Sequence, residues 1–83
     1  MDDEIRSILA RYGRLAVPAG TLGEHDDLPR VGLTSHASVS VMLALEDQFD
    51  IEFPESMLRK STFESIAAIR VAVQTLLSVG QAS

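Results

Sequence analysis

The sequence predicts an all-α domain: a small four-helix bundle of three main helices and one short helix, with a long first loop. Three stretches of the chain place apolar residues at the i, i+3, i+4, i+7 spacing of a helix face. The alternating run 49–53 has no second strand to pair with, and an unpaired strand leaves backbone groups unsatisfied. With 83 residues the chain is expected to form one domain, 1–83, burying about 60–65% of its unfolded surface.

The first helix begins at Asp2 and Asp3, whose charges suit the N-terminal end of the helix dipole. Its end is expected between Tyr12 and Val17, because Pro18 follows. One apolar stripe is predicted to face the core: Ile5, Ile8, Leu9 and Tyr12.

Val17–Thr34 contains too many helix breakers for a helix and is too irregular for a strand. A loop of this length in a compact domain is usually functional or held down by its own side chains. The expected anchors are Leu22, Leu28, Val31 and Leu33.

The second helix, over Ser35–Asp50, has no glycine or proline. Its core face is predicted from Val41, Leu45 and Phe49, with Met42 beside them. Val39 and Leu43 lie roughly 160–200° around the helix from that face, at about 100° per residue. They are expected either to form a small docking surface or to pack beneath the loop.

Residues 49–53 are predicted to be an extended linker whose Ile51 and Phe53 plug the core. Pro54 then opens a short helix over Glu55–Lys60. The run 61–64 has the capping-box form Ser-x-x-Glu, so the last helix is expected to start there, to stop near Gly80 and to leave 81–83 frayed. Its core side is predicted to be Phe63, Ile66, Ile69, Val73, Leu76 and Leu77.

The net charge of −5 argues against a nucleic-acid partner, which would need clustered lysine and arginine. Five acids and no base occur over 46–55, which indicates either a solvated face or a surface complementary to a basic protein. The absence of cysteine excludes a disulfide framework and a thiolate site. No signal peptide and no run of ~20 apolar residues is visible, so we expect a cytoplasmic monomer without a membrane partner.

The chain is organised around Gly32-Leu33-Thr34-Ser35-His36, where the loop meets the second helix. Ser35 stands where that helix should start, and serine is a favoured N-cap. Together with the helix end Leu45-Glu46-Asp47-Gln48-Phe49 and the exit Ile51-Glu52-Phe53-Pro54, this motif resembles the acyl and peptidyl carrier proteins over essentially the whole chain. In that family a serine in a Gly-x-Asp-Ser-Leu motif receives a phosphopantetheine arm. The resemblance implies an acyl-carrier-protein-like fold with the arm on Ser35.

Two residues depart from the family motif. Thr34 replaces the usual aspartate, which removes a charge and a possible metal-ordering group but not the hydroxyl to be modified. His36 replaces the usual leucine, a position that partner enzymes touch, and either retunes partner choice or is simply exposed. His36 is not expected to activate Ser35 as a catalytic nucleophile, since adjacent helical residues point about 100° apart and no Gly-x-Ser-x-Gly elbow is present.

The favoured hypothesis is a freestanding carrier protein that catalyses nothing, binds no metal and holds its cargo as a thioester on the phosphopantetheine arm. His25, Asp26 and Asp27 are interpreted as a solvated loop, because three neighbouring side chains rarely converge on one ion. The predicted partner-binding residues are His36, Val39, Leu43, Glu46 and Asp47.

The partners that the resemblance implies are a phosphopantetheinyl transferase, an adenylate-forming cargo ligase and downstream acyl or aminoacyl transferases. The cargo stays open between an acyl or polyketide chain and an amino acid, which a ligase related to aminoacyl-tRNA synthetases would load. One alternative is an acidic helical interaction module that is never modified. A minimal serine hydrolase is the weakest hypothesis.

Overall fold

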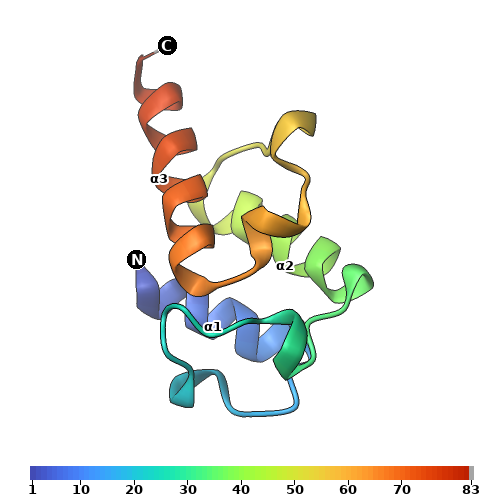
Figure 1. Cartoon of the computed structure of the whole chain (residues 1–83). Helices are drawn as coiled ribbons and strands as arrows, with labels where there is room; N and C mark the ends of the chain where they lie inside the picture. The colour runs from blue at the N-terminus through green and yellow to red at the C-terminus, as the bar shows by residue number, and fades with distance from the viewer. Residues whose placement is uncertain (83) are drawn as a thin grey trace.

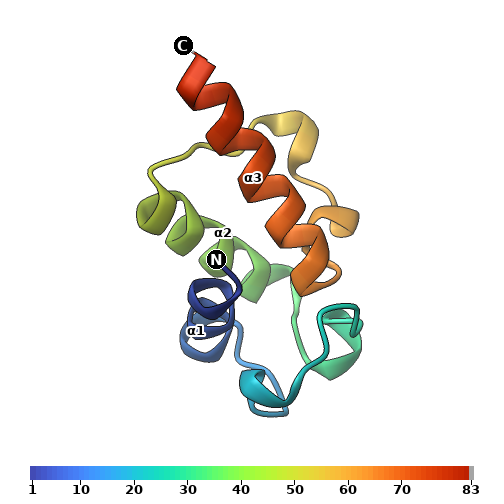
Figure 2. The same ribbon diagram turned by 90° about the vertical axis from the view of Figure 1, so that its left-hand side faces the viewer.

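The computed structural model describes the backbone of residues 1–82 and the side chains of residues 1–78. Three α-helices, α1 (Asp2–Tyr12), α2 (Ser35–Phe49) and α3 (Ile66–Ala82), form the bundle, and no strand occurs in this described part. The predicted all-α fold is therefore confirmed. Figure 1 and Figure 2 show α1 packed beside α2, with α3 crossing both and its C-terminal end projecting beyond them. No helix in the described range is long and apolar enough to cross a membrane.

Helix α1 ends at Tyr12, inside the predicted window, and directs Ile5 and Leu9 into the core, where both are fully buried. The predicted core role of Tyr12 is wrong, because its side chain is 41% exposed. Tyr12 occupies the last position of the helix, where the chain turns away from the bundle. The Arg11 guanidinium lies over its ring, 5.6 Å from the ring centroid.

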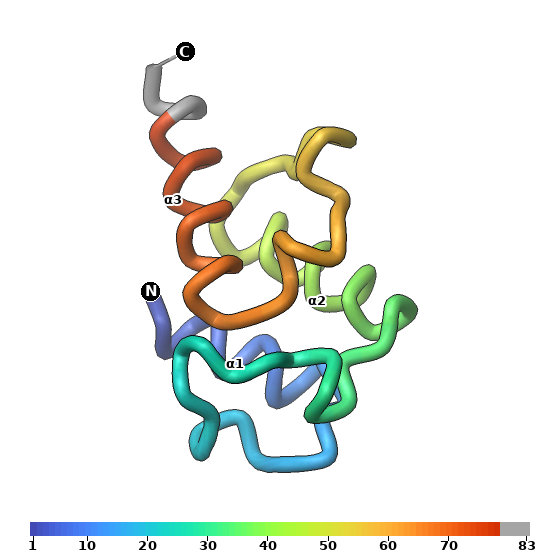
Figure 3. The backbone as a smooth tube through the Cα atoms, in the orientation of Figure 1, coloured from blue at the N-terminus to red at the C-terminus, as the bar shows by residue number. Residues whose placement is uncertain are grey.

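The long first loop is held down by its own side chains, as predicted. Leu22, Leu28 and Leu33 are buried, and Val31 packs against them partly exposed. The loop contains two short 3₁₀ turns, η1 (Ala19–Thr21) and η2 (Pro29–Val31). The tube in Figure 3 shows the whole segment wrapped along the base of the bundle.

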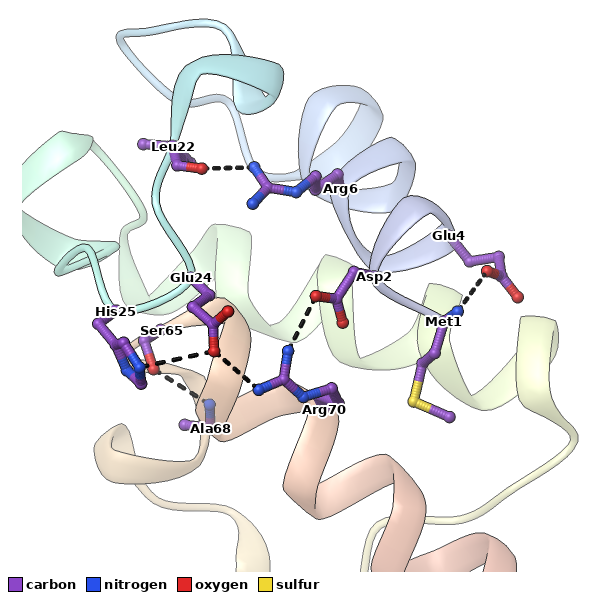
Figure 4. Close-up of polar contacts among 10 residues, drawn as sticks. All are labelled: Met1, Asp2, Glu4, Arg6, Leu22, Glu24, His25, Ser65, Ala68 and Arg70. Carbon is purple, nitrogen blue, oxygen red and sulfur yellow. Dashed lines mark hydrogen bonds and ion pairs between the residues drawn. The ribbon is translucent and has the colours of Figure 1, made fainter.

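Polar contacts fasten this loop to both terminal helices (Figure 4). The Arg6 guanidinium on α1 donates to two loop carbonyls, those of Ala19 (2.9 Å) and Leu22 (2.6 Å). The Arg70 guanidinium on α3 donates to Asp2 of α1 at 2.8 Å and to Glu24 of the loop at 2.9 Å. The loop therefore presents the start of α2 from a fixed position.

The core face of α2 is the predicted one, since Val41 and Leu45 are fully buried. The linker that follows is extended, and its Phe53 plugs the core as predicted, 6% exposed and 5.6 Å from Phe63 between ring centroids. Ile51 packs partly buried against the same core.

The predicted short helix over Glu55–Lys60 is wrong. Two 3₁₀ turns take its place, η3 (Glu55–Met57) and η4 (Lys60–Phe63), and Leu58 and Arg59 break the segment between them. After this break, Phe63 is buried in the core and its ring lies against that of Phe53.

The predicted start and end of the last helix are also wrong. Helix α3 starts at Ile66, and the Ser65 hydroxyl caps it by accepting the Ala68 N–H at 3.1 Å, so the Ser61 capping box is not used. The helix continues through Gly80 to Ala82, since one glycine in a last turn costs only about 1 kcal/mol. Ser83, the last of the residues expected to fray, lies outside the described residues.

Candidate phosphopantetheine site

The cap of α2 is Thr34 and not Ser35, which corrects the expected N-cap. Thr34 is extended (φ −80°, ψ 166°), and its Oγ1 accepts the Ala37 N–H at 3.0 Å. Its carbonyl oxygen accepts from the Ser38 N–H at 2.9 Å, the first bond of the helix. Threonine supplies the same capping oxygen as serine. Ser35 is consequently the first helical residue, exposed, and its hydroxyl has no hydrogen-bond partner among residues 1–78.

Gly32 fixes the approach of the loop to this helix end. Its φ of 113° is left-handed, a region that favours glycine, and an added Cβ would lie 3.0 Å from the Ala16 backbone nitrogen. That nitrogen donates to the Val31 carbonyl at 2.8 Å, so the two backbones run in close contact. The glycine of the serine motif therefore lets the segment just before α2 pack closely against residues 14–16, which follow α1.

The N-terminus of α2 offers a favourable environment for a phosphodiester. The N–H groups of Ser35 and His36 precede the first intrahelical bond, and the first turn carries no acidic side chain. Free N–H groups and the helix dipole both favour negative charge at this position.

An open groove of about 480 Å³ lies beside Ser35, between the first turns of α2 and residues 58–63. Its lining is mainly apolar, and Arg59 and Lys60 contribute the positive charge. The apolar side chains that line it are Pro29, Leu33, Val39, Met42, Leu58 and Phe63. The contribution of residues 58–60 was not predicted. No periodic signal in the sequence marks it, because it depends on where the chain folds back after the linker.

The predicted partner-binding residues share the solvent face of α2. At about 100° per residue, His36, Val39, Leu43, Glu46 and Asp47 fall within roughly 100° of one another, opposite the buried face. Val39 is 52% and Leu43 is 55% exposed, so the alternative that they pack beneath the loop is wrong. His36 is exposed as well.

Glu46 and Asp47 differ in their surroundings. Glu46 is partly buried, and its Oε2 accepts the Phe53 N–H at 2.8 Å, which ties the end of α2 to the linker. Asp47 is exposed at the edge of a second groove, about 430 Å³, which also carries Asp3 and Glu4 of α1. The acidic surface beside α2 therefore includes the first turn of α1. From the sequence, the acids of that turn were interpreted only as partners of the helix dipole.

The site has no catalytic arrangement around Ser35. No hydrogen bond joins the side chains of His36 and Ser35, and no group of three or more potential metal ligands occurs in the described residues. Within the His25-Asp26-Asp27 run, Asp26 stabilises the loop: its Oδ2 accepts the Gly23 N–H at 2.8 Å and closes a turn.

An exposed serine at a helix N-terminus, free of capping and with no base hydrogen-bonded to its hydroxyl among residues 1–78, suits attachment of a prosthetic group and not catalysis. The family model for the phosphopantetheine attachment site matches residues 3–74, so the chain belongs to the phosphopantetheine-binding carrier proteins. It is a carrier protein with covalently attached phosphopantetheine and is not an enzyme.

The chain is similar over most of its length to a named relative and to solved structures. The chain is 43% identical to the aminoacyl carrier protein of Agrobacterium fabrum, over the full length of both. It resembles a chain in the crystal structure of an engineered Bradyrhizobium japonicum glycine:[carrier protein] ligase complexed with carrier protein from Agrobacterium tumefaciens and AMP. That match has a TM-score of 0.87 and 46% identity and covers 89% of this chain and 99% of the other. A solution structure of an Agrobacterium tumefaciens protein matches with a TM-score of 0.78 and 43% identity over the whole of both chains.

Proposed function

We propose that Ser35 bears the phosphopantetheine arm and that the cargo is an aminoacyl group, held as a thioester on the terminal thiol of the arm. The observation that carries this proposal is the Ser35 hydroxyl, exposed at the first position of α2 and released from capping by Thr34. The arm would supply the thiol that this cysteine-free chain lacks.

Attachment requires a separate transferase. The Ser35 Oγ forms a bond to the phosphorus of coenzyme A next to pantetheine, the bond to the bridging diphosphate oxygen breaks, and adenosine 3′,5′-bisphosphate leaves. The hydroxyl proton passes to a base of the transferase, because no side chain among residues 1–78 hydrogen-bonds to Ser35. The N–H groups at the start of α2 then face the new phosphodiester.

The aminoacyl cargo is supported by the relatives. One of them is an aminoacyl carrier protein, and another structure pairs a carrier protein with a glycine:[carrier protein] ligase. For this chain we propose loading by an adenylate-forming ligase: the arm thiol gives up its proton to a base or to solvent and its sulfur attacks the carbonyl of the aminoacyl adenylate. The thioester bond forms, the bond between the carbonyl carbon and the phosphate oxygen breaks, and AMP leaves. A downstream transferase then accepts the aminoacyl group.

The solvent face of α2 is the proposed docking surface for these enzymes. Two half-exposed apolar side chains, Val39 and Leu43, lie between His36 at the N-terminal end and Asp47 near the C-terminal end. Glu46 contributes less to the attraction of a basic partner than a free carboxylate would, because one of its oxygens accepts the Phe53 N–H. Charge complementarity of this kind mainly raises the association rate and selectivity.

The attachment is tested by intact mass. After incubation with coenzyme A and a broad-specificity phosphopantetheinyl transferase, we expect the mass of one phosphopantetheine to be added, mapped by peptide fragmentation to Ser35. The Ser35→Ala variant should gain nothing. Ser38→Ala, in the same helix turn, is the matched control and should load as wild type. An unchanged mass with several transferases would favour the unmodified interaction module.

The cargo is tested on the loaded protein. With ATP, glycine and a carrier-protein ligase, we expect a second mass gain that hydroxylamine removes, as it does for a thioester. Parallel incubations with other amino acids and with fatty acids and acyl ligases define the range. Loading by acyl groups alone would contradict the aminoacyl proposal and leave the Ser35 attachment standing.

A further inference from the structure

Arg59 and Lys60 stand out among the basic residues of this acidic chain. Arg6 donates hydrogen bonds to two loop carbonyls, and Arg70 is paired with two carboxylates. The exposed side chains of Arg59 and Lys60 have no carboxylate partner within the described residues, and the same holds for the other three arginines, Arg11, Arg14 and Arg30. Arg59 and Lys60 differ from these three because they line the groove that opens at Ser35. The Arg59 Nε donates to the Ser56 carbonyl at 2.9 Å, which steadies the guanidinium without neutralising it.

The same groove exposes apolar surface that the fold does not cover. Leu58, next to these two bases, is 50% exposed, and Val39 on α2 is 52% exposed. Met42 and Phe63 continue the apolar lining. Apolar side chains gathered in a groove beside charged groups are typical of a ligand site that takes a molecule with a charged end and an apolar body.

We propose that Arg59 and Lys60 bind the phosphodiester of the phosphopantetheine arm and that the arm lies along this groove. This inference rests on the proposed attachment at Ser35. The arm has the required chemistry: its phosphodiester carries one negative charge, and the neighbouring pantoyl unit carries two methyl groups. Arginine and lysine form charge-assisted hydrogen bonds to phosphate, and the methyl groups would cover Leu58 and Val39.

Such an arm would dock reversibly. Ion pairs of exposed side chains are weak and are screened by salt. Val39 lies both in the groove and on the docking face of α2, so a partner that contacts Val39 competes with the docked arm. The expected consequence is a carrier that keeps its arm along the groove when alone and releases it when an enzyme binds.

The experiment compares NMR spectra of the isotope-labelled protein before and after loading. In wild type, we expect shift changes at the amides of 58–63 and at the methyl groups of Val39, Met42 and Leu58, in addition to those around Ser35. In Arg59→Gln/Lys60→Gln the groove changes should be lost while those around Ser35 persist. Arg11→Gln, which removes a base from the other groove, should behave as wild type.

A second readout is the alkylation of the arm thiol by a neutral maleimide. We expect the rate to rise roughly two- to fivefold in Arg59→Gln/Lys60→Gln, and in wild type at high salt. The exchanged variant Arg59→Lys/Lys60→Arg keeps both charges and should retain the groove shifts, which covers the case in which the double glutamine variant folds poorly. Shift changes confined to Ser35 and its neighbours in loaded wild type would overturn this inference alone. A wild-type protein that gains no mass would overturn the proposed attachment, and this inference with it.

Discussion

Thr34 and Ser35 are adjacent hydroxyl residues whose surroundings differ. Thr34 Oγ1 accepts the Ala37 N–H at 3.0 Å, whereas the Ser35 hydroxyl has no partner among the described side chains. We predict that Thr34→Ala lowers the free energy of unfolding by about 1 kcal/mol, the usual loss for an N-cap, and that Thr34→Asp retains it. Ser35→Ala should stay within about 0.5 kcal/mol of wild type. Urea denaturation measures all three, and an equal loss in Thr34→Ala and Ser35→Ala would mean that Ser35 shares the cap.

Gly32 and Gly20 give a matched pair in the same loop. Gly32 has a φ of 113°, and a Cβ added there would lie 3.0 Å from a backbone nitrogen, whereas a Cβ added at Gly20 meets nothing within 4 Å. We predict that Gly32→Ala lowers the free energy of unfolding by about 1–3 kcal/mol, since strain and close contact add. Gly20→Ala should be neutral within about 1 kcal/mol, or slightly stabilising. Thermal and urea unfolding measure the stability of both variants. Equal losses in Gly32→Ala and Gly20→Ala would contradict the prediction that a side chain at position 32 is strained.

At the scale of elements, Arg70 of α3 is paired with carboxylates of both α1 and the loop (Figure 4). The Arg70 guanidinium, which hydrogen-bonds to Glu24, lowers the pKa of Glu24 below its ordinary value of 4.5. A carboxyl with a lower pKa in the folded chain stabilises the fold above its unfolded pKa and loses that contribution as pH falls through the folded pKa. We predict that Glu24→Gln is less stable than wild type at pH 7 and that the difference disappears as pH falls below 4.5.

The contribution of the Glu24–Arg70 ion pair is measured by urea unfolding of wild type and Glu24→Gln across pH 3–7. Glu52→Gln is the control, since Glu52 is exposed and makes no ion pair within the described part of the chain. Its stability should follow wild type at each pH. A Glu24→Gln difference that stays constant from pH 7 to pH 3 would show that the ionised carboxylate is not its cause.

The helices could be predicted from the sequence where local periodicity determines them. The spacing of Val41 and Leu45 predicted the buried face of α2, and both are fully buried. The start of α3 could not be predicted, because Ser61 and Ser65 are both acceptable caps. In the structure Ser65 caps the helix, and Phe63 before it packs against Phe53, a tertiary contact that the local capping pattern does not contain. The same reason applies to the groove beside Ser35: residues 58–60 approach α2 only after the chain has folded back.

For the whole molecule, we expect the charge and the exposed apolar side chains to make separate contributions to the proposed docking of partner enzymes. The chain carries a net charge of −5, and Asp47 extends the solvent face of α2 toward the acids of α1. Long-range attraction to a basic enzyme surface raises the association rate and falls with salt, since the screening length is about 10 Å at 0.1 M. The apolar contact that follows is short-range and keeps its strength in salt. The two contributions can therefore be separated by ionic strength.

Substitution of Leu43 tests the apolar contribution to partner binding separately, because its side chain is 55% exposed and does not line the groove beside Ser35. We predict that Leu43→Ser lowers kcat/KM for ligase loading on the order of tenfold at both low and high salt, with unfolding free energy within about 0.5 kcal/mol of wild type. Val71→Ser is the matched control: Val71 is 58% exposed on α3, and its substitution should leave loading unchanged. Asp47→Lys should slow loading mainly at low salt. Equal losses in Leu43→Ser and Val71→Ser would place the ligase elsewhere than on the solvent face of α2.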